Sequence, residues 1–318
     1  MSEKFATRVT GGPNRRPQIV LFVEEGSGDW HARQLKTAME TMGAGVVITT
    51  LKACAFDTRM ACGIDIPGFE GTLPDGAFVR SVSTGSLEQI TLRLGVLHAL
   101  RESGVRVWND ARTIERCVDK STATFLFQQA GLPVPPTRVG EGLPNAQRFM
   151  EEQRYDIVVK PLFGSQGNGV TRVSQAADLP APETVGNVYY AQRYLRRVDE
   201  TEFVDWRILV SGGRILAAMS RAGATWVTNI HQGATAAAFD YDEQMGSLAL
   251  RACAAIGADY AGVDIIRDEA GNLMVLEINS NPAWKGLQSV TDVNIAWTLA
   301  EDFLQAVAVA ASARNATA

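Results

Sequence analysis

Length, composition and charge exclude several classes of protein. The 318 residues are enough for two or three domains, and 46% hydrophobic with 20% charged residues is ordinary for a globular protein. A net charge of -5 argues against nucleic acid as a partner. Four cysteines without CxxC spacing and three histidines predict neither a disulfide framework nor a zinc site. With no signal-peptide core and no apolar run of about 18 residues, we expect a cytoplasmic protein without a membrane partner.

The first third of the chain alternates strand and helix patterns. Compact apolar runs and amphipathic stretches predict, in order, strand Gln18–Glu24, helix Ser27–Met42, strands Val46–Leu51 and Ala77–Ser81, helix Leu87–Ser103 and strand Val105–Trp108. This alternation favours a small open α/β domain over residues 17–108, after a flexible leader at 1–16. The acidic segment after the first strand would repel a dinucleotide phosphate.

From Asn109 onward the pattern changes. One helix is predicted over Asp110–Ala130, with Lys120 in its middle. Further along, the patterns predict strands Ile157–Lys160, Val170–Val173 and Val188–Leu195, a hairpin of Trp206–Val210 with Arg214–Met219, and helices Glu243–Ile256 and Asn294–Ala311.

A second hairpin, Val263–Arg267 with Leu273–Ile278, carries paired carboxylates. A four-residue turn places Asp268 opposite Leu273 and Asp264 opposite Glu277, with Cβ atoms about 5 Å apart. Asn279 lies on the same face as Glu277. An ordinary hairpin with an exposed polar face has the same pattern. Facing carboxylates repel unless a cation lies between them, however, and oxygen ligands favour Mg²⁺ over Zn²⁺.

A glycine-rich loop follows the strand that ends at Lys160. Glycines at 164, 167 and 169 allow backbone amides to approach a polyphosphate as a flap. A glycine-rich hairpin loop without a ligand is the alternative. Lys160 interrupts an apolar strand, and its ammonium group needs an anionic partner such as phosphate.

Other polar positions have a structural and a functional interpretation. Lys120 is either a solvated helix residue or a phosphate ligand. The strand end at 192–195 could present its backbone to an adenine edge, with Tyr194 and Leu195 on its face. Asp205 could accept hydrogen bonds from ribose hydroxyls. Arg207 and Arg221 are placed to meet anionic groups or to form surface ion pairs.

Taken together, the segments KPLFGSQGNGV, AGVDIIR and LEINSNP resemble the ATP-grasp superfamily, and within it the RimK-like α-L-glutamate ligases. The resemblance covers roughly Asn109 to Leu304. It implies a fold of the α/β class, in the α+β form of the ATP-grasp domain. A preATP-grasp α/β domain at 17–108 would precede this domain. Residues 109–195 would form the central lid subdomain and 196–318 the C-terminal subdomain with the metal site.

The resemblance also implies a reaction. ATP phosphorylates a carboxylate, an amine attacks the acylphosphate, and an amide forms with release of ADP and phosphate. Arg221 and Lys285 are the expected catalytic residues, and Asp264, Glu277 and Asn279 the ligands of Mg²⁺ or Mn²⁺. The expected ATP-binding residues are Lys120, Lys160, Gly164, Ser165, Gln166, Gly167, Gly169, Gln192, Arg193, Tyr194, Leu195, Asp205 and Asn229.

The chain departs from the RimK-like pattern in a few places. Val227 and Gln232 stand where basic residues are common, and Trp284 and Lys285 replace small and acidic residues. Because these departures add an aromatic face and an ammonium group beside the metal site, we hypothesise a different substrate, such as a cofactor whose ring stacks on Trp284. Glutamate ligases that act on tetrahydromethanopterin or related one-carbon cofactors are similar proteins and would suit this hypothesis.

The expected partners are a small-molecule carboxylate and an amine, with L-glutamate as the amine. Another amine, or a non-catalytic ATP-binding protein of synapsin type, remains an alternative. Exposed apolar surface on the first domain would support a homo-oligomer.

Overall fold

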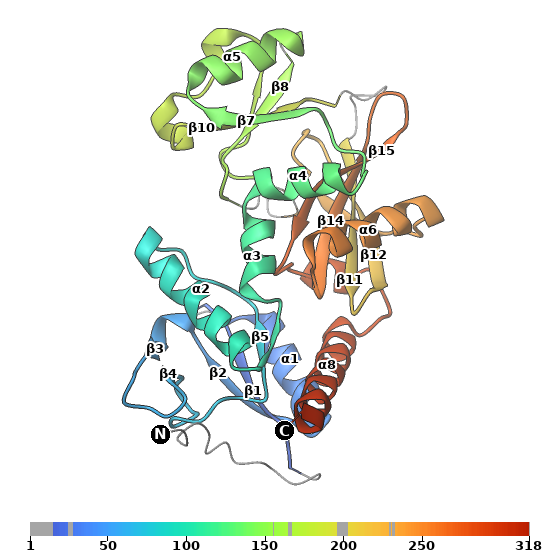
Figure 1. Cartoon of the computed structure of the whole chain (residues 1–318). Helices are drawn as coiled ribbons and strands as arrows, with labels where there is room; N and C mark the ends of the chain where they lie inside the picture. The colour runs from blue at the N-terminus through green and yellow to red at the C-terminus, as the bar shows by residue number, and fades with distance from the viewer. Residues whose placement is uncertain are drawn as a thin grey trace. The chain divides into compact units, whose positions relative to one another are not determined.

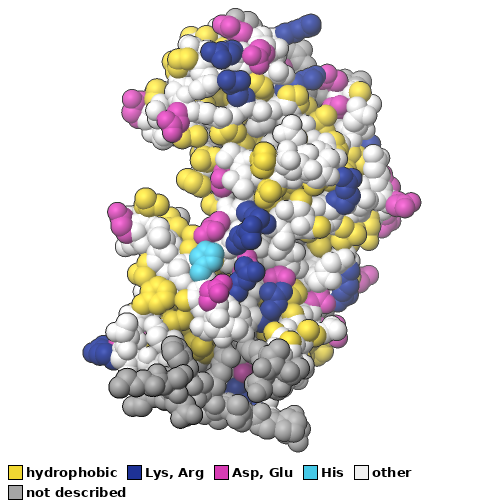
Figure 2. Space-filling view, viewed as in Figure 1, with side chains coloured by type: hydrophobic (Ala, Val, Ile, Leu, Met, Phe, Trp, Pro, Cys, Tyr) yellow, Lys and Arg dark blue, Asp and Glu magenta, His cyan; other side chains and the backbone are white. Residues whose placement is uncertain are grey.

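The computed structural model describes residues 15–24, 28–154, 156–164, 167–195, 203–228, 230 and 233–317. The chain divides into two compact units (Figure 1). Unit 1 comprises residues 1–112 together with 294–318, and unit 2 comprises residues 113–293. Basic and acidic side chains are interspersed on the face shown in Figure 2, which differs from the continuous basic surface that nucleic-acid binding uses.

Unit 1 is built on a four-stranded parallel sheet in the order β2-β1-β5-β6. Its strands are β1 (Gln18–Phe22), β2 (Gly45–Thr49), β5 (Gly76–Val79) and β6 (Arg106–Trp108). The apolar side chains of β1 and β5 are buried, as expected for parallel strands covered on both faces. Helices α1 (Trp30–Thr41) and α2 (Leu87–Glu102) begin at the side-chain caps Asp29 and Ser86. A short ladder joins β3 (Ala55–Phe56) to β4 (Ile64–Asp65).

The final helix, α8 (Ile295–Thr317), belongs to unit 1. It packs against α1, and the Phe303 ring meets Phe78 edge-on at 5.3 Å and Trp108 at 6.0 Å. This grouping differs from the sequence-based boundary, which places residues 196–318 in one subdomain. In the part of the chain that the structure describes, no helix combines the length and apolar character needed to cross a membrane.

The small sheet of unit 2 is antiparallel, in the order β7-β10-β8-β9. Its strands are β7 (Thr137–Glu141), β8 (Ile157–Lys160), β9 (Thr171–Val173) and β10 (Val188–Arg193). Helix α5 (Leu143–Glu152) covers one face (Figure 1), and its Phe149 and Met150 pack with Ile157 and Tyr189. β7 and α5 were not predicted from the sequence.

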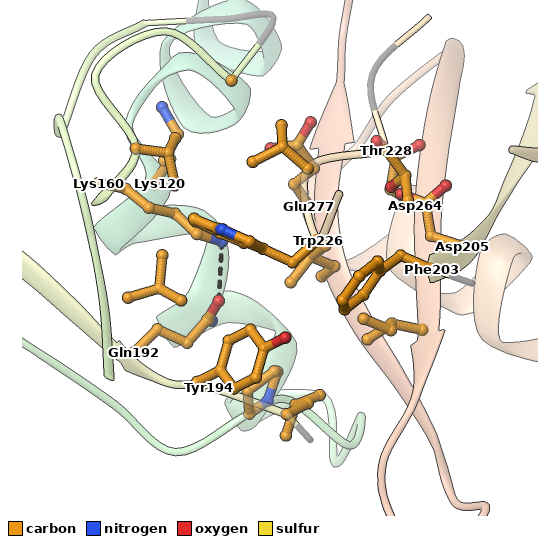
Figure 3. A pocket seen from close by; sticks show the side chains of 18 of the residues that line it. Lys120, Lys160, Gln192, Tyr194, Phe203, Asp205, Trp226, Thr228, Asp264 and Glu277 are labelled. Atoms are coloured by element: carbon orange, nitrogen blue, oxygen red, sulfur yellow. Dashed lines mark hydrogen bonds between the residues drawn. The ribbon is translucent and has the colours of Figure 1, made fainter. Parts of the chain in front are cut away.

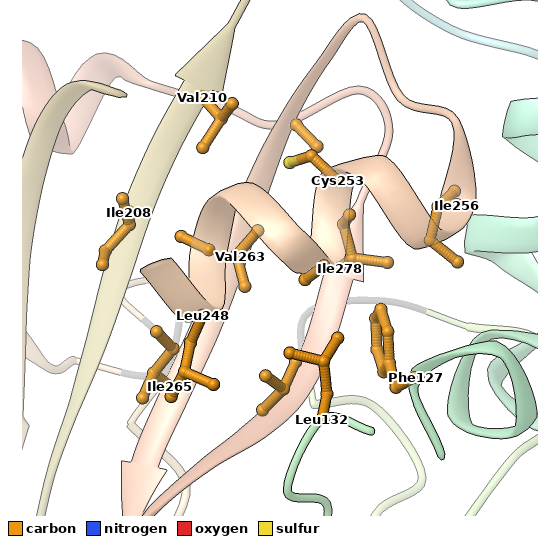
Figure 4. Packing of buried hydrophobic residues seen from close by; sticks show 14 of the residues in the cluster. Phe127, Leu132, Ile208, Val210, Leu248, Cys253, Ile256, Val263, Ile265 and Ile278 are labelled. Atoms are coloured by element: carbon orange, nitrogen blue, oxygen red, sulfur yellow. The ribbon is translucent and has the colours of Figure 1, made fainter. Parts of the chain in front are cut away.

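The large sheet of unit 2 has the order β13-β12-β11-β14-β15. Its strands are β11 (Phe203–Ser211), β12 (Arg214–Gly223), β13 (Thr235–Ala238), β14 (Tyr260–Arg267) and β15 (Leu273–Asn279). Helix α6 (Glu243–Ile256) lies on one face, where Leu248 and Ile256 pack with Ile208, Val263 and Ile278 (Figure 4). This core leaves the opposite face of β11, β12 and β14 available for polar side chains.

The helix predicted over Asp110–Ala130 is wrong as a single element. The chain forms α3 (Ala111–Val118) and then α4 (Lys120–Gln129). Asp119 separates them, because its Oδ1 accepts from the backbone N of Ser121 at 2.9 Å and of Thr122 at 3.2 Å. Lys120 is therefore the first residue of a helix, not a residue in the middle of one.

The hairpin of β14 and β15 has the predicted carboxylate pairing but a different turn. Arg267, not Asp268, faces Leu273. Asp268 instead accepts from the backbone N of Ala270 and Asn272, which lengthens the turn by one residue. A bulge next to Asp264 compensates for this residue, so Asp264 faces Glu277, as predicted, and Gly262 faces Asn279.

Candidate active site

One cleft of unit 2 is lined by both sheets and by α4 (Figure 3). It spans about 1070 Å³, a volume that includes space open to solvent. The structure brings twelve predicted site residues to it: Lys120, Lys160, Gly164, Gly167, Gln192, Arg193, Tyr194, Leu195, Asp205, Arg221, Asp264 and Glu277. Because these side chains come from segments far apart in the chain, the cleft is a product of the tertiary fold.

The two lysines lie on the small-sheet side of the cleft. Lys120 donates from Nζ to the carbonyl oxygens of Gly164 at 2.9 Å and Leu162 at 3.3 Å, so it contacts the start of the glycine-rich loop. Burial lowers the pKa of Lys120, and the charges of Glu277 and Asp119 oppose this shift. Burial also lowers the pKa of Lys160 to about 8, despite the nearby charge of Glu277. Both ammonium groups therefore favour an anion in the cleft.

Gln192 is held in one orientation by a buried network. Its Oε1 accepts from Lys160 Nζ at 2.8 Å, while its Nε2 donates to Thr137 Oγ1 at 3.0 Å and to Tyr190 OH at 3.2 Å. Because both ends of the amide have fixed partners, Gln192 fixes the position of the Lys160 ammonium group.

Aromatic side chains form another wall of the cleft. The guanidinium of Arg172 lies 3.6 Å from the centre of the Tyr194 ring, and Asp156 accepts two hydrogen bonds from that guanidinium. The Trp226 ring meets Tyr194 edge-on at 6.0 Å, and Phe203 also lines the cleft. Flat rings of this kind suit the face of a planar ligand.

Two arginines and two aspartates form a buried cluster on the large sheet. Arg221 donates from Nε to Asp205 Oδ1 at 2.7 Å, and Arg207 donates from Nε and Nη2 to the two oxygens of Asp264, both at 2.7 Å. Arg221 Nη2 also lies 3.0 Å from Asp264 Oδ2. The sheet register explains these contacts, because Asp205 is directly opposite Arg221 and Arg207 is directly opposite Asp264.

The pKa values of the two acids in the cluster are shifted in opposite directions. Burial raises the pKa of Asp264, but the charges of Arg207 and Arg221 outweigh burial and hold that pKa well below its usual range. Burial raises the pKa of Asp205, and Arg221 offsets this only in part. Asp264 is therefore the more firmly ionised carboxylate of the cluster.

The predicted metal ligands fit a hard cation in their chemistry. Asp264 and Glu277 face each other, and Asn279 donates from Nδ2 to Glu277 Oε1 at 3.2 Å. Carboxylate and amide oxygens suit Mg²⁺. Among the described residues, no group of three or more His, Cys, Asp and Glu side chains is placed to hold a metal, so the amide of Asn279 is needed to complete this set.

Several predicted residues do not line the cleft. Asn279, Gly169 and the exposed Lys285, which begins helix α7 (Lys285–Gln288), are not part of the lining. Trp284 is only 1% exposed, so the hypothesis that it stacks on a substrate ring is wrong. Its large apolar ring contributes to the core instead. Ser165, Gln166, Asn229 and Gln232 lie outside the described residues.

Phe203, Trp226 and Thr228 line the cleft but were not predicted from the sequence. Arg207 also had no definite role in the sequence-based prediction. The sequence held a signal for Phe203 and Arg207. Each lies two residues from Asp205, so strand alternation places both on the same face of β11 as Asp205. No comparable period leads to Trp226, which lies between strands.

The cleft brings lysines of α4 and β8 together with carboxylates of the large sheet, an arrangement typical of ATP-grasp enzymes. Residues 117–303 match the model of the RimK-like ATP-grasp domain, and the chain belongs to this family. It is therefore an ATP-dependent carbon–nitrogen ligase, as expected from its motifs.

Relatives are named as glutamate ligases. A tetrahydromethanopterin:alpha-L-glutamate ligase of Methanococcus maripaludis is 34% identical over 234 residues, covering 72% of this chain and 78% of that protein. The protein of that name from Methanosarcina acetivorans is 28% identical, with coverage of 84% and 92%. A probable alpha-L-glutamate ligase of Xanthomonas campestris pv. campestris is 32% identical, with coverage of 77% and 82%.

Solved structures share the fold. D-cycloserine synthetase DcsG has a TM-score of 0.69 at 22% identity, covering 91% of this chain and 99% of that one. The ATP-grasp ligase PsnB complexed with minimal precursor, Mg and ADP has a TM-score of 0.67 at 20% identity, with coverage of 93% and 98%. The predicted ATP-grasp fold is thereby confirmed.

Proposed function

We propose that the protein joins L-glutamate through its amine to the carboxylate of a small acidic cofactor or cofactor precursor. The names of the relatives support glutamate and a cofactor acceptor. The observation that carries the proposal is the single cleft shared by Lys120, Lys160, Arg221 and the carboxylates of Asp264 and Glu277. Such a cleft provides cations for phosphate groups and acids for a divalent ion at one place.

The residues of the cleft divide the work of the reaction. A carboxylate oxygen of the acceptor attacks the γ-phosphorus of ATP, ADP leaves, and the glutamate amine then displaces phosphate from the acyl carbon. Lys120 and Lys160 neutralise the phosphate groups, and Gln192 and Tyr194 hold the base. Arg221 steadies the acylphosphate. Asp264, Glu277 and Asn279 would hold Mg²⁺, or Mn²⁺ in its place, which would supply positive charge to the phosphate groups.

Exclusion of water belongs to the same proposal. An acylphosphate hydrolyses if water reaches it before the amine does. The loop that begins at Gly164 would close over the phosphates, and the contact from Lys120 to this loop links closure to the cation that meets the nucleotide. The small sheet would serve as the lid subdomain, as the motifs imply.

The acceptor can be identified by mass spectrometry. A small-molecule extract is incubated with the protein, Mg-ATP and isotopically labelled glutamate, and a product heavier by one or more glutamyl units is expected. Asp264→Asn should abolish this product. ADP formation with a different amino acid or amine, without transfer of label, would contradict glutamate while keeping the ligase. Nucleotide binding without turnover on any substrate would contradict catalysis.

A homo-oligomer is also part of the proposal. Large apolar side chains of unit 1 are exposed, among them Phe56, Leu87 and Leu92, at 49%, 78% and 48%. Apolar side chains exposed to this degree favour contact with another copy. Analytical ultracentrifugation should show a species larger than 34.3 kDa, and a monomer at all concentrations would contradict this part.

A further inference from the structure

Asp264 has two roles that conflict with each other. As a proposed metal ligand it must offer a carboxylate oxygen to a cation. In the structure, both oxygens already accept charge-assisted hydrogen bonds from Arg207 at 2.7 Å, and Oδ2 also lies 3.0 Å from Arg221 Nη2. A carboxylate has about four lone-pair positions, so three of them are occupied by guanidinium groups.

Burial makes this conflict sharper. The side chain of Asp264 is 2% exposed and those of Arg207 and Arg221 are 14% and 3% exposed, so water screens the charges weakly. A divalent cation at Asp264 would lie close to two guanidinium groups that carry the same sign of charge. The carboxylate can therefore bind the cation fully only when a guanidinium withdraws.

Arg207 is the guanidinium better suited to withdraw. Arg221 is held by a second acid, since it donates to both oxygens of Asp205. Among the described residues, the hydrogen bonds of the Arg207 side chain go to Asp264, and this side chain is the more exposed of the two arginines. Loss of Asp264 to a cation would leave Arg207 with its positive charge available for a new anion.

We propose that Arg207 is a positioning residue that competes with the divalent cation for Asp264. It holds Asp264 in place while the cleft is empty, and it gives Asp264 up when the metal-nucleotide binds. The released guanidinium then faces the cleft as a partner for the acidic substrate, so the nucleotide prepares the site for the acceptor. This inference rests on the proposed function, because it takes Asp264 as a metal ligand.

Competition predicts that removal of Arg207 strengthens binding of the metal-nucleotide, which is unusual for an arginine beside a phosphate-binding cleft. If Arg207 only attracted phosphate, its removal would weaken binding of the metal-nucleotide. If it competes for Asp264, Arg207→Met should tighten binding of Mn²⁺ in the presence of ADP by about tenfold, the effect of removing charge-assisted hydrogen bonds. Electron paramagnetic resonance of free Mn²⁺ measures this affinity without turnover.

Two further variants separate competition from net charge. Arg207→Lys keeps the charge but loses the two-pronged contact, and it should also tighten Mn²⁺ binding, by a smaller factor. Arg193→Met removes an arginine that lines the cleft and pairs with Glu269, not with Asp264, and it should not tighten binding to the same extent. Circular dichroism checks that each variant is folded. If Arg207→Met does not fold, Arg207→Lys carries the test in its place.

The outcomes distinguish this inference from the function on which it rests. Wild-type protein that binds no Mn²⁺ with ADP would overturn both. Wild-type binding with equal or weaker binding in both Arg207 variants would overturn the competition alone. An equal increase in Mn²⁺ affinity in Arg193→Met and Arg207→Met would also overturn the competition, because the loss of one positive charge near the cleft would then explain both results.

Discussion

Lys160 donates from Nζ to Gln192 Oε1 at 2.8 Å inside the cleft, and burial lowers the pKa of this lysine to about 8. The ammonium group is therefore held by a neutral acceptor at a place where its charge is unfavourable. An incoming phosphate would supply the missing negative charge. This relationship makes the lysine sensitive to pH in the range where enzymes are assayed.

We expect binding of ADP to weaken as pH rises through about 8, the pKa of Lys160, because the neutral amine no longer attracts phosphate. Between pH 7 and pH 9 the loss should be about tenfold in isothermal titration calorimetry. Lys160→Arg should remove this dependence, since arginine stays charged, whereas Lys120→Arg should keep it. A flat profile in the wild type would contradict the prediction.

The same pKa has a consequence for stability. The pKa of Lys160 is about 8 in the folded protein and 10.5 for an ordinary lysine, so the unfolded chain binds more protons between these values. The contribution of Lys160 to the free energy of unfolding should therefore rise with pH across that window and be lowest below it. Comparison of urea unfolding for wild type and Lys160→Met at pH 7.5 and 10 measures this contribution.

Asp119 should matter both for stability and for the nucleotide. Asp119→Ala removes the cap of α4 and should lower the free energy of unfolding by about 1 kcal/mol. It should also weaken ADP binding, because Lys120 is the next residue. Asp242→Ala is the matched control, since Asp242 caps α6 through Met245 N at 2.8 Å and does not line the cleft. Equal ADP affinity in Asp119→Ala and Asp242→Ala would contradict the prediction that the helix cap at Asp119 positions Lys120 for the nucleotide.

Trp226 should report on the occupancy of the cleft. Its ring contacts Tyr194 in the lining, so ADP with Mg²⁺ should change the intrinsic tryptophan fluorescence. Trp226→Phe should lose most of that change while retaining binding measured by calorimetry. Trp297→Phe, at an exposed position of α8 outside the lining, is the control and should keep the signal. A signal that persists in Trp226→Phe would place the responding ring elsewhere.

Trp284 and Lys285 are adjacent but should behave differently. Trp284→Ala should destabilise the protein by about 3 to 5 kcal/mol in thermal or urea unfolding, because it removes a fully buried ring. Lys285→Ala should leave stability and ADP affinity unchanged and raise KM for the acidic acceptor, if its exposed ammonium contacts that substrate. Unchanged Michaelis constants for both co-substrates would remove Lys285 from the proposed site.

Local sequence patterns were sufficient for much of the fold. Apolar runs located β1, β5, β8 and β10 to within a few residues, because buried strands need continuous or alternating apolar side chains. The division of one predicted helix into α3 and α4 was missed because Asp119 competes for backbone N–H groups inside an otherwise helical pattern. β7 was missed because Thr137–Glu141 has no clear apolar alternation. α5 was missed although Ala146, Phe149 and Met150 follow a helical period, because it has only ten residues and begins at Gly142 without a side-chain cap.

The sequence by itself determined the chemistry of the site. It specified two lysines, a glycine-rich loop and a set of oxygen ligands, because these residue types and spacings are readable along the chain. The pairing of Asp264 with Glu277 was also predicted. The longer turn shifts the register by one residue, and the bulge shifts it back by one residue, so the pairing is unchanged.

Tertiary structure alone decided which charges meet. Arg207 and Arg221 reach Asp264 because the order β12-β11-β14 makes neighbours of strands separated by α6 in the chain. The burial of Trp284 and the packing of α8 in unit 1 likewise depend on contacts between distant segments, which no local pattern specifies.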